Sequence, residues 1–115
     1  MPLLQVFTNV RDSKIPDGFL SDMSDMFQKA IGKPMEAILV SVVPNQTMMF
    51  GGSSDACALA KMTSIGSLGI EENKNLTKVI TAAMAKMNVA ADRMYVIFRD
   101  IAPQDVGFNN TTFAS

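Results

Sequence analysis

The 115-residue chain is 48% apolar and 18% charged with a formal net charge of -1, a composition typical of a single globular domain spanning residues 1–115. Its lysines and arginines are scattered along the sequence, which argues against a basic nucleic-acid-binding surface, so no nucleic acid partner is expected. The longest apolar run, residues 37–43, is far shorter than the roughly 20 residues that cross a bilayer, so no membrane insertion is expected.

The chain begins with Met1-Pro2, ahead of a short strand predicted over residues 3–8. Because an initiator methionine is normally trimmed before a small residue, the secondary amine of Pro2 would become the free N-terminus. An α-amino group titrates at roughly 7.7 to 8.0, and burial or a nearby cation lowers that pKa. Pro2 is therefore a candidate general base. The alternative is that it only starts an edge strand, where its missing N–H costs nothing.

A helix is predicted over residues 19–31, because apolar residues recur along one face with a 3.6-residue period. The face consists of Phe19, Leu20, Met23, Met26, Phe27, Ala30 and Ile31. Pro16-Asp17-Gly18 precedes the helix, and Gly32 ends it in the usual C-terminal position. Lys33 and Pro34 then return the chain to extended geometry.

Residues 37–43 are almost wholly apolar, which is the pattern of a strand covered on both faces. A short edge strand is predicted over residues 47–50, a loop over residues 51–54, and a further strand over residues 56–65.

A second helix is predicted to start near Ile70 or Glu71, and its apolar face runs from Leu76 to Met87. Residues 94–98 form a second fully apolar strand. The tail over residues 106–113 places turn-forming residues around two phenylalanines.

The order strand, helix, strand occurs twice, because residues 3–8 correspond to 59–64 and residues 38–43 to 94–99. The predicted fold class is therefore α+β, a split β-α-β repeat with two helices on one face of a four-stranded mixed sheet. With both helices on one face, the apolar residues on the other face need a partner other than water. Self-association through free strand edges into a closed ring is the simplest solution.

Several kinds of site are excluded by residue counts. Cys57 is the only cysteine, so no internal disulfide is expected. The chain has no histidine, which removes serine-histidine triads, cysteine-histidine dyads and the usual zinc sites. No metal and no cofactor are expected.

Other candidate features have plainer interpretations. Ser53 and Ser54 follow two glycines, but the lysine of a phosphate-binding loop is missing and no helix follows at once. The ten methionines suit core filling by a flexible apolar side chain. Lys33 lies just past a helix C-terminus, where a lysine commonly serves the helix dipole.

Ordered motifs run the whole length of the chain. They include Met1-Pro2, residues 16–20, Gly32-Lys33-Pro34, residues 50–54, Cys57-Ala58-Leu59, Ser64-Ile65-Gly66, Asp92-Arg93 with Tyr95, and Val106-Gly107-Phe108-Asn109-Asn110. In this order and spacing the chain resembles the macrophage migration inhibitory factor family of the tautomerase superfamily. The resemblance implies a homotrimeric cytokine that tautomerises small aromatic 2-oxo acids such as phenylpyruvate and isomerises dopachrome-like rings, with no cofactor.

The resemblance also implies a role for each matching position. Pro2 would be the general base, with its pKa lowered by the like charge of Lys33 and by an apolar wall. Lys33 would pair with the substrate carboxylate, and Ser64 with the backbone N–H of Ile65 would complete that anion site. Tyr95, from the neighbouring subunit, would lie near the site of proton return. The apolar wall would be formed by Val106, Phe108 and Phe113.

Three positions depart from the family pattern. Ile97 stands in the substrate site where a well-known member has an asparagine that reaches a substrate phenol, so phenylpyruvate should be favoured over its hydroxylated analogue. Ala37 replaces an aromatic residue at the rim and should widen the pocket mouth. Cys57 has no second cysteine at Ala60, so thiol-disulfide exchange through a Cys-x-x-Cys motif is excluded.

The signalling role implied by the resemblance is less complete in this sequence. The pair that contacts chemokine-type receptors is half present, with Arg11 displaced by one position and Asn45 replacing the acid; invariant-chain receptors are the other partners implied. The N-terminus lacks a secretory signal, so a cytoplasmic protein secreted by a non-classical route is expected. Two alternatives remain, a receptor ligand with a vestigial pocket and a small-molecule isomerase without signalling.

Overall fold

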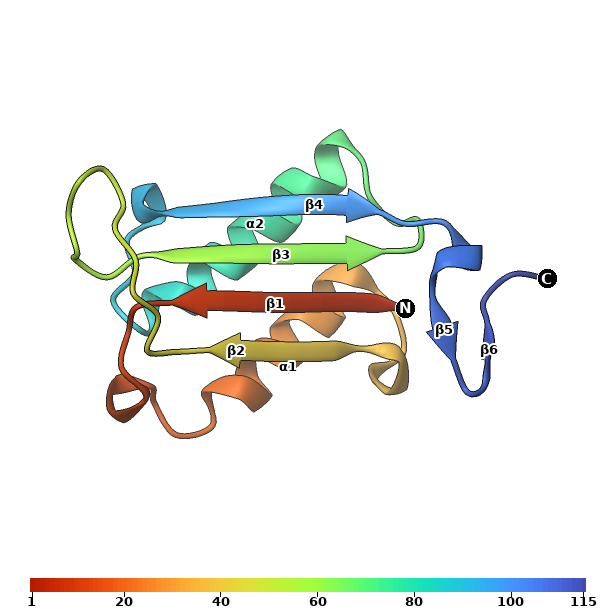
Figure 1. The fold of residues 1–115 in the computed structure, drawn as a ribbon, viewed down its shortest axis with the longest axis horizontal. Helices are drawn as coiled ribbons and strands as arrows, with labels where there is room; N and C mark the ends of the chain where they lie inside the picture. The colour runs from red at the N-terminus through yellow and green to blue at the C-terminus, as the bar shows by residue number, and fades with distance from the viewer.

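The computed structural model describes all 115 residues, and its centre is a four-stranded mixed sheet (Figure 1). The strands are β1 (Pro2–Thr8), β2 (Leu39–Val43), β3 (Ala58–Ser64) and β4 (Met94–Asp100), in the order β2-β1-β3-β4. β1 runs parallel to β2 and β3 runs parallel to β4, whereas the two central strands are antiparallel to each other. The sheet thus consists of two parallel pairs joined at its middle, which confirms the predicted repeat.

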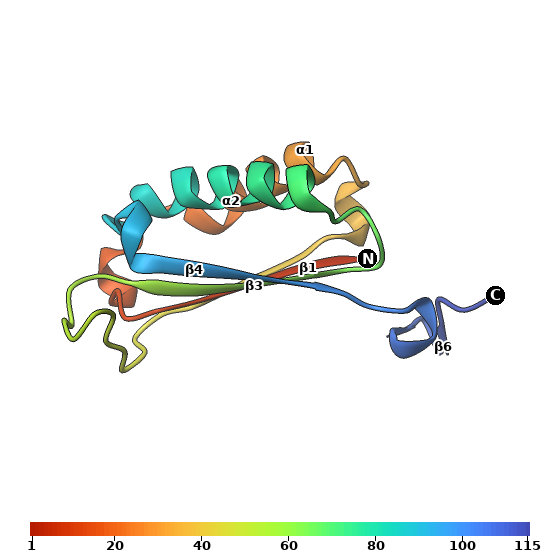
Figure 2. The same ribbon diagram turned by 90° about the horizontal axis from the view of Figure 1, so that it is seen from above.

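Both helices, α1 (Phe19–Ile31) and α2 (Ile70–Ala85), lie on the same face of the sheet, as Figure 2 shows. Each contributes its periodic apolar face to one core, where they meet the strand residues that point toward them. The most buried of these residues are Phe19, Met23 and Phe27 of α1, Leu76, Ile80 and Met84 of α2, and Leu4, Val6, Ala60 and Met62 of the sheet. The predicted α+β architecture is confirmed.

The end of α1 follows from one glycine. Gly32 has φ +71°, in the left-handed region, and its N–H donates to the carbonyl of Gln28 at 2.9 Å. Only glycine adopts this conformation without a steric penalty, so the helix ends where the sequence predicts. α2 ends at Ala85, two residues before Met87, which remains buried in the core from the following turn.

The predicted edge strand over residues 47–50 is not formed. Only Phe50 makes a β-bridge, and its partner is Ser53 three residues later. A strand needs a neighbouring chain to receive its backbone hydrogen bonds, and no strand of this subunit lies beside residues 47–49. β2 is also shorter than predicted, because a 3-10 turn over Met35–Ala37 precedes it.

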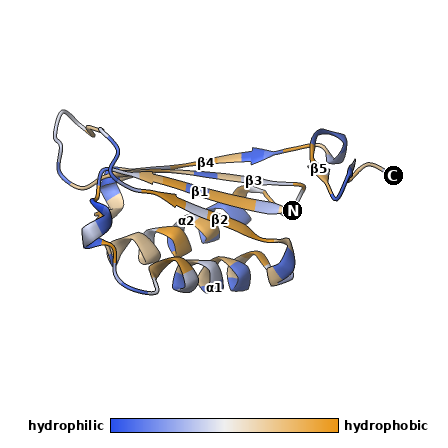
Figure 3. Ribbon diagram, turned by 60° about the horizontal axis from the view of Figure 1, so that its bottom comes forward, coloured by the Kyte–Doolittle hydropathy of each residue, from blue (hydrophilic) through white to orange (hydrophobic).

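The face of the sheet away from the helices is partly apolar and open. Alternation along the strands places Leu39 of β2 and Tyr95 and Ile97 of β4 on this face, with 61%, 66% and 54% of their surface exposed. Lys61 of β3 lies opposite Ile97 in the parallel register. Figure 3 shows hydrophobic residues spread along β1 and β2, whereas α1 alternates between hydrophobic and hydrophilic segments.

A small hairpin of β5 (Gly107–Phe108) and β6 (Thr111–Thr112) lies beyond the end of the four-stranded sheet (Figure 1). Asn109 and Asn110 connect the two strands with φ values of +51° and +69°, as a two-residue turn with positive φ at both central positions requires. Short 3-10 turns complete the chain at Asp12–Lys14, Met35–Ala37, Ala91–Arg93 and Pro103–Asp105. No helix has the length and hydrophobicity needed to cross a bilayer.

Candidate functional site

A cavity of about 500 Å³ opens at the end of the sheet where β1 begins. Three segments distant in sequence line it: the N-terminus, the stretch that enters β2, and the C-terminal hairpin. The lining residues are Met1, Pro2, Leu3, Pro34, Glu36, Ala37, Ile38, Leu39, Val106, Gly107, Phe108 and Phe113. The cavity therefore brings Pro2 together with all three residues of the predicted apolar wall.

Pro2, which lines this cavity, is buried because it begins a central strand. β1 lies between β2 and β3, and Pro2 faces Ser64 across the antiparallel ladder. Proline is accepted as the first residue of a strand, since the ladder there does not require its N–H. The strand register thus places the Pro2 nitrogen beside the end of β3.

The carbonyl oxygen of Met1 receives two hydrogen bonds from that end of β3. The N–H of Ile65 donates to it at 3.3 Å, and Ser64 Oγ donates at 3.4 Å. Both donors were predicted to form an anion site. This carbonyl belongs to the peptide bond whose nitrogen is that of Pro2, so the two donors converge on an oxygen next to the predicted basic atom.

The apolar wall is provided by the hairpin. The rings of Phe108 and Phe113 are stacked, with centroids 5.5 Å apart and planes 10° from parallel. Their strands are held together by the β5–β6 ladder and by the Phe113 N–H, which donates to the carbonyl of Val106 at 3.1 Å. In this subunit 63% of Phe108 and 42% of Phe113 are exposed, which leaves their surfaces available to a ligand.

One charged side chain lines the cavity. It belongs to Glu36, which is exposed, and the one salt bridge of the chain is formed elsewhere, between Lys74 and Glu71. Ala37 also lines the rim, as predicted. Lys33 does not line the cavity but immediately precedes Pro34, which does.

Tyr95 and Ile97 lie away from this cavity within one subunit. Both are on β4, on the open face of the sheet. Tyr95 is paired with Leu59 at the start of β3, whereas Pro2 is paired with Ser64 at its end. The subunit therefore brings together Pro2, Ser64, Ile65, Val106 and the two phenylalanines, but not the two β4 residues.

Sequence reasoning gave no role to Glu36 or to the side chain of Arg93. Arg93 donates hydrogen bonds of 3.0 to 3.1 Å to the carbonyls of Phe50, Ser53, Asp55 and Ala56, and its guanidinium lies 5.7 Å from the centroid of the Phe50 ring. It thus fixes the loop between β2 and β3. The sequence signal for this residue was the Asp92-Arg93 motif just before β4.

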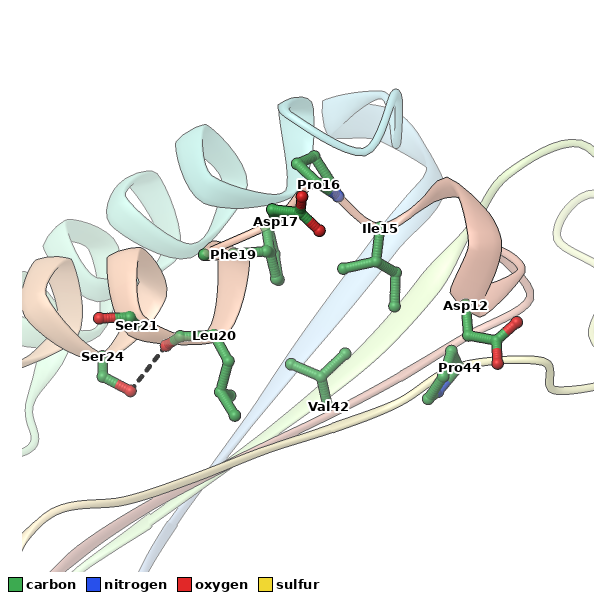
Figure 4. A pocket seen from close by; sticks show the side chains of 11 residues that line it. Asp12, Ile15, Pro16, Asp17, Phe19, Leu20, Ser21, Ser24, Val42 and Pro44 are labelled. Atoms are coloured by element: carbon green, nitrogen blue, oxygen red, sulfur yellow. Dashed lines mark hydrogen bonds between the residues drawn. The ribbon is translucent and has the colours of Figure 1, made fainter.

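A larger hollow of about 700 Å³ lies between the start of α1 and the end of β2 (Figure 4). Its carboxylates, Asp12 and Asp17, are exposed and lie well apart from each other in this view. Ser24 Oγ donates to the carbonyl of Leu20 at 2.8 Å and is thereby satisfied within the helix. None of the predicted site residues lines this hollow, so the smaller cavity is the candidate site.

The chain is similar to known proteins of one family. The family model described as macrophage migration inhibitory factor matches residues 1–114. Macrophage migration inhibitory factor from Xenopus tropicalis is 43% identical, and that from Rattus norvegicus 40%, each over 99% of this chain and 100% of the relative. The structure of macrophage migration inhibitory factor from Trichinella spiralis superposes with a TM-score of 0.92 and 28% identity, covering 96% of this chain and 99% of that one.

Proposed function

Because the chain belongs to the macrophage migration inhibitory factor family, we propose that it is a homotrimeric, cytokine-type keto-enol tautomerase whose general base is the N-terminal amine of Pro2. The proposed substrate is a small aromatic 2-oxo acid such as phenylpyruvate, or a dopachrome-like ring. The proposed signalling role, through invariant-chain and chemokine-type receptors, requires secretion by a non-classical route.

The observation that carries the enzymatic proposal is the pair of donors around the Met1 carbonyl. The Ile65 N–H and Ser64 Oγ both donate to the carbonyl oxygen of Met1. The carbon of this carbonyl is bonded to the Pro2 nitrogen. When Met1 is removed, that nitrogen changes from an amide to a basic secondary amine, and both donors lose their acceptor. A substrate carboxylate would then replace the Met1 oxygen as the acceptor next to the base.

The reaction needs one proton removed and one returned. The neutral Pro2 amine would take a proton from the carbon next to the substrate carbonyl, and the electrons of that C–H bond would form the carbon-carbon double bond of the enol. The carbonyl oxygen would receive a proton from solvent water and the Pro2 ammonium would release its proton to solvent, so the enol has the same composition as the ketone and the base is regenerated. In the reverse direction the Pro2 ammonium would return its proton to carbon.

The apolar lining of the cavity suits both an aromatic substrate and an uncharged base. Pro2 is buried among apolar residues, which disfavours a protonated amine, and the stacked Phe108 and Phe113 offer an apolar surface to a ring. Lys33, adjacent to the lining residue Pro34, would attract the carboxylate. Tyr95 would act on the site of a neighbouring subunit, because its own Pro2 is at the other end of β3.

Two measurements test the proposal. Mass spectrometry of the purified protein should show Met1 absent, and this protein should tautomerise phenylpyruvate. Pro2→Gly should lower kcat by about 10²- to 10⁴-fold, the usual contribution of a general base, while the protein keeps its oligomeric state in sedimentation analysis. Full activity of Pro2→Gly, or of a protein that retains Met1, would show that Pro2 is not the base. Inactivity of the processed wild-type protein would favour a receptor ligand with a vestigial pocket.

A further inference from the structure

One carboxylate and two aromatic rings line the same cavity. They are those of Glu36 and of the stacked Phe108 and Phe113, and Glu36 is the only lining residue with a charged side chain. We propose that this part of the cavity binds a cationic group, so that the preferred ligands are aromatic 2-oxo acids whose ring carries an ammonium substituent. This inference deepens the proposed function, because it concerns substrate selection in the same cavity.

The first argument is electrostatic. Glu36 forms no ion pair within the subunit, and its carboxylate lies at an exposed rim of a mostly apolar cavity. A ligand cation at the rim would gain attraction to this carboxylate without having to break an existing salt bridge. A ligand anion at the same place would be repelled.

The second argument comes from the rings. Aromatic faces attract cations through their quadrupole, and quaternary ammonium groups are bound in proteins by this means. Phe108 and Phe113 are stacked with each other and remain 63% and 42% exposed, so their free surfaces are not covered by other side chains of the subunit. The Glu36 carboxylate and the two phenylalanine rings therefore both favour a cationic substituent on the ligand.

The third argument is the shape of the cavity. Pro2 is buried at one end, whereas Glu36 is exposed, so a ligand reaching the base extends its far end toward the rim. The neighbouring rim residue is Ala37, whose small side chain leaves space for a branched substituent. The carboxylate of the ligand would bind near Ser64 and Ile65, and its cationic end near Glu36.

Binding of two isosteric probes tests this inference without requiring turnover. Para-trimethylammonio-phenylacetate and para-tert-butyl-phenylacetate differ in charge but hardly in shape, and both lack the ketone that tautomerises. Calorimetry with the processed wild-type protein should give about five- to tenfold tighter binding of the cationic probe, from one exposed ion pair plus one cation-ring contact. The preference should weaken as salt is added.

Two variants test whether Glu36 is responsible for the preference for the cationic probe. Glu36→Gln should reduce the preference for the cationic probe by about three- to fivefold, the amount expected for one exposed ion pair. Glu72→Gln removes the same charge from an exposed position on α2 and should leave the preference unchanged. Equal binding of the two probes, or equal effects of the two variants, would overturn the inference. Turnover of unsubstituted phenylpyruvate, measured separately, reports on the proposed function alone.

Discussion

The ring of Tyr95 packs against that of Phe50, with centroids 5.1 Å apart and planes 45° to each other. This contact lies at the end of the sheet opposite the cavity, since Tyr95 pairs with Leu59 and Pro2 with Ser64. Five residues of extended chain span about 17 Å. Tyr95 therefore cannot reach the Pro2 of its own subunit, and any catalytic role must be exerted on another copy.

Subunit mixing tests whether Tyr95 acts on a neighbour. Pro2→Gly and Tyr95→Ala are each expected to lower activity on phenylpyruvate. When the two variants are co-expressed as mixed trimers, some sites combine an intact Pro2 with an intact Tyr95 from the adjacent copy. The mixture should then be several times more active than either variant alone. Activity no higher than the mean of the two parents would contradict a role across the subunit interface.

Ser64 should contribute to binding of the substrate carboxylate. Ser64→Ala removes a hydroxyl that donates toward the oxygen next to Pro2. A hydrogen bond to a charged group is worth about 1.5–3 kcal/mol, so kcat/KM for phenylpyruvate should fall by about 10- to 150-fold. Steady-state kinetics measure this. Ser21→Ala, at an exposed position of α1, should leave kcat/KM unchanged.

The rate should fall at acid pH, because only the neutral amine of Pro2 accepts a proton. Burial disfavours the protonated form of this amine, so the acidic limb of kcat/KM should be centred below the usual 7.7 to 8.0 of an amino terminus. Above this pKa the amine is unprotonated and the rate reaches a plateau.

Glu36 acts in the opposite direction, because a carboxylate lining the same cavity stabilises the protonated amine. Glu36→Gln should therefore move the acidic limb to lower pH. An acidic limb that stays centred above pH 8 in the wild-type protein would contradict the assignment of Pro2 as a buried base.

Ile97 lies away from its own cavity, so it should determine how ring hydroxyls are tolerated in the cavity of a neighbouring copy. Its side chain offers no hydrogen-bonding group, so a para-hydroxyl that packs against it would lose its bond to water without replacement. Phenylpyruvate should have a higher kcat/KM than para-hydroxyphenylpyruvate. Ile97→Asn supplies a partner and should raise the relative kcat/KM of the hydroxylated substrate by about tenfold. An unchanged ratio would show that Ile97 does not contact the ring substituent.

Arg93 should stabilise the fold through the loop before β3. Its guanidinium donates to four backbone carbonyls in a planar arrangement that lysine cannot reproduce. Arg93→Lys should lower the free energy of unfolding by about 1–3 kcal/mol in urea titrations at fixed protein concentration. Arg99→Lys, at an exposed position with no such bonds, should change it by less than about 0.5 kcal/mol.

The helices and four of the five predicted strands could be read from the sequence because their signals are local. The period of the apolar residues and Gly32 fix α1 without reference to the rest of the chain. The strand predicted over residues 47–50 failed because strand formation depends on a partner, and the subunit offers none there. The apolar pattern indicated a strand but could not supply the neighbour.

The candidate site residues were also only partly predictable, because their arrangement depends on contacts between segments distant in sequence. The predicted wall residues line the cavity with Pro2, and the antiparallel register of β1 and β3 brings Ser64 and Ile65 beside it, whereas Lys33 does not line the cavity. No local pattern encodes that register. Glu36 was missed because a charged residue in a short turn looks like ordinary surface until the hairpin of residues 107–112 is seen beside it.

The hairpin of β5 and β6 projects beyond the sheet, and its backbone hydrogen bonds are made within residues 106–113. A segment with so few outside contacts opens with little free energy, and its amide protons exchange quickly with solvent. A ligand packed against Phe108 and Phe113 would close this hairpin onto the rest of the cavity. Slower hydrogen exchange at the amide of Phe113, which donates to Val106, would therefore report occupancy of the cavity even by a compound that never reacts.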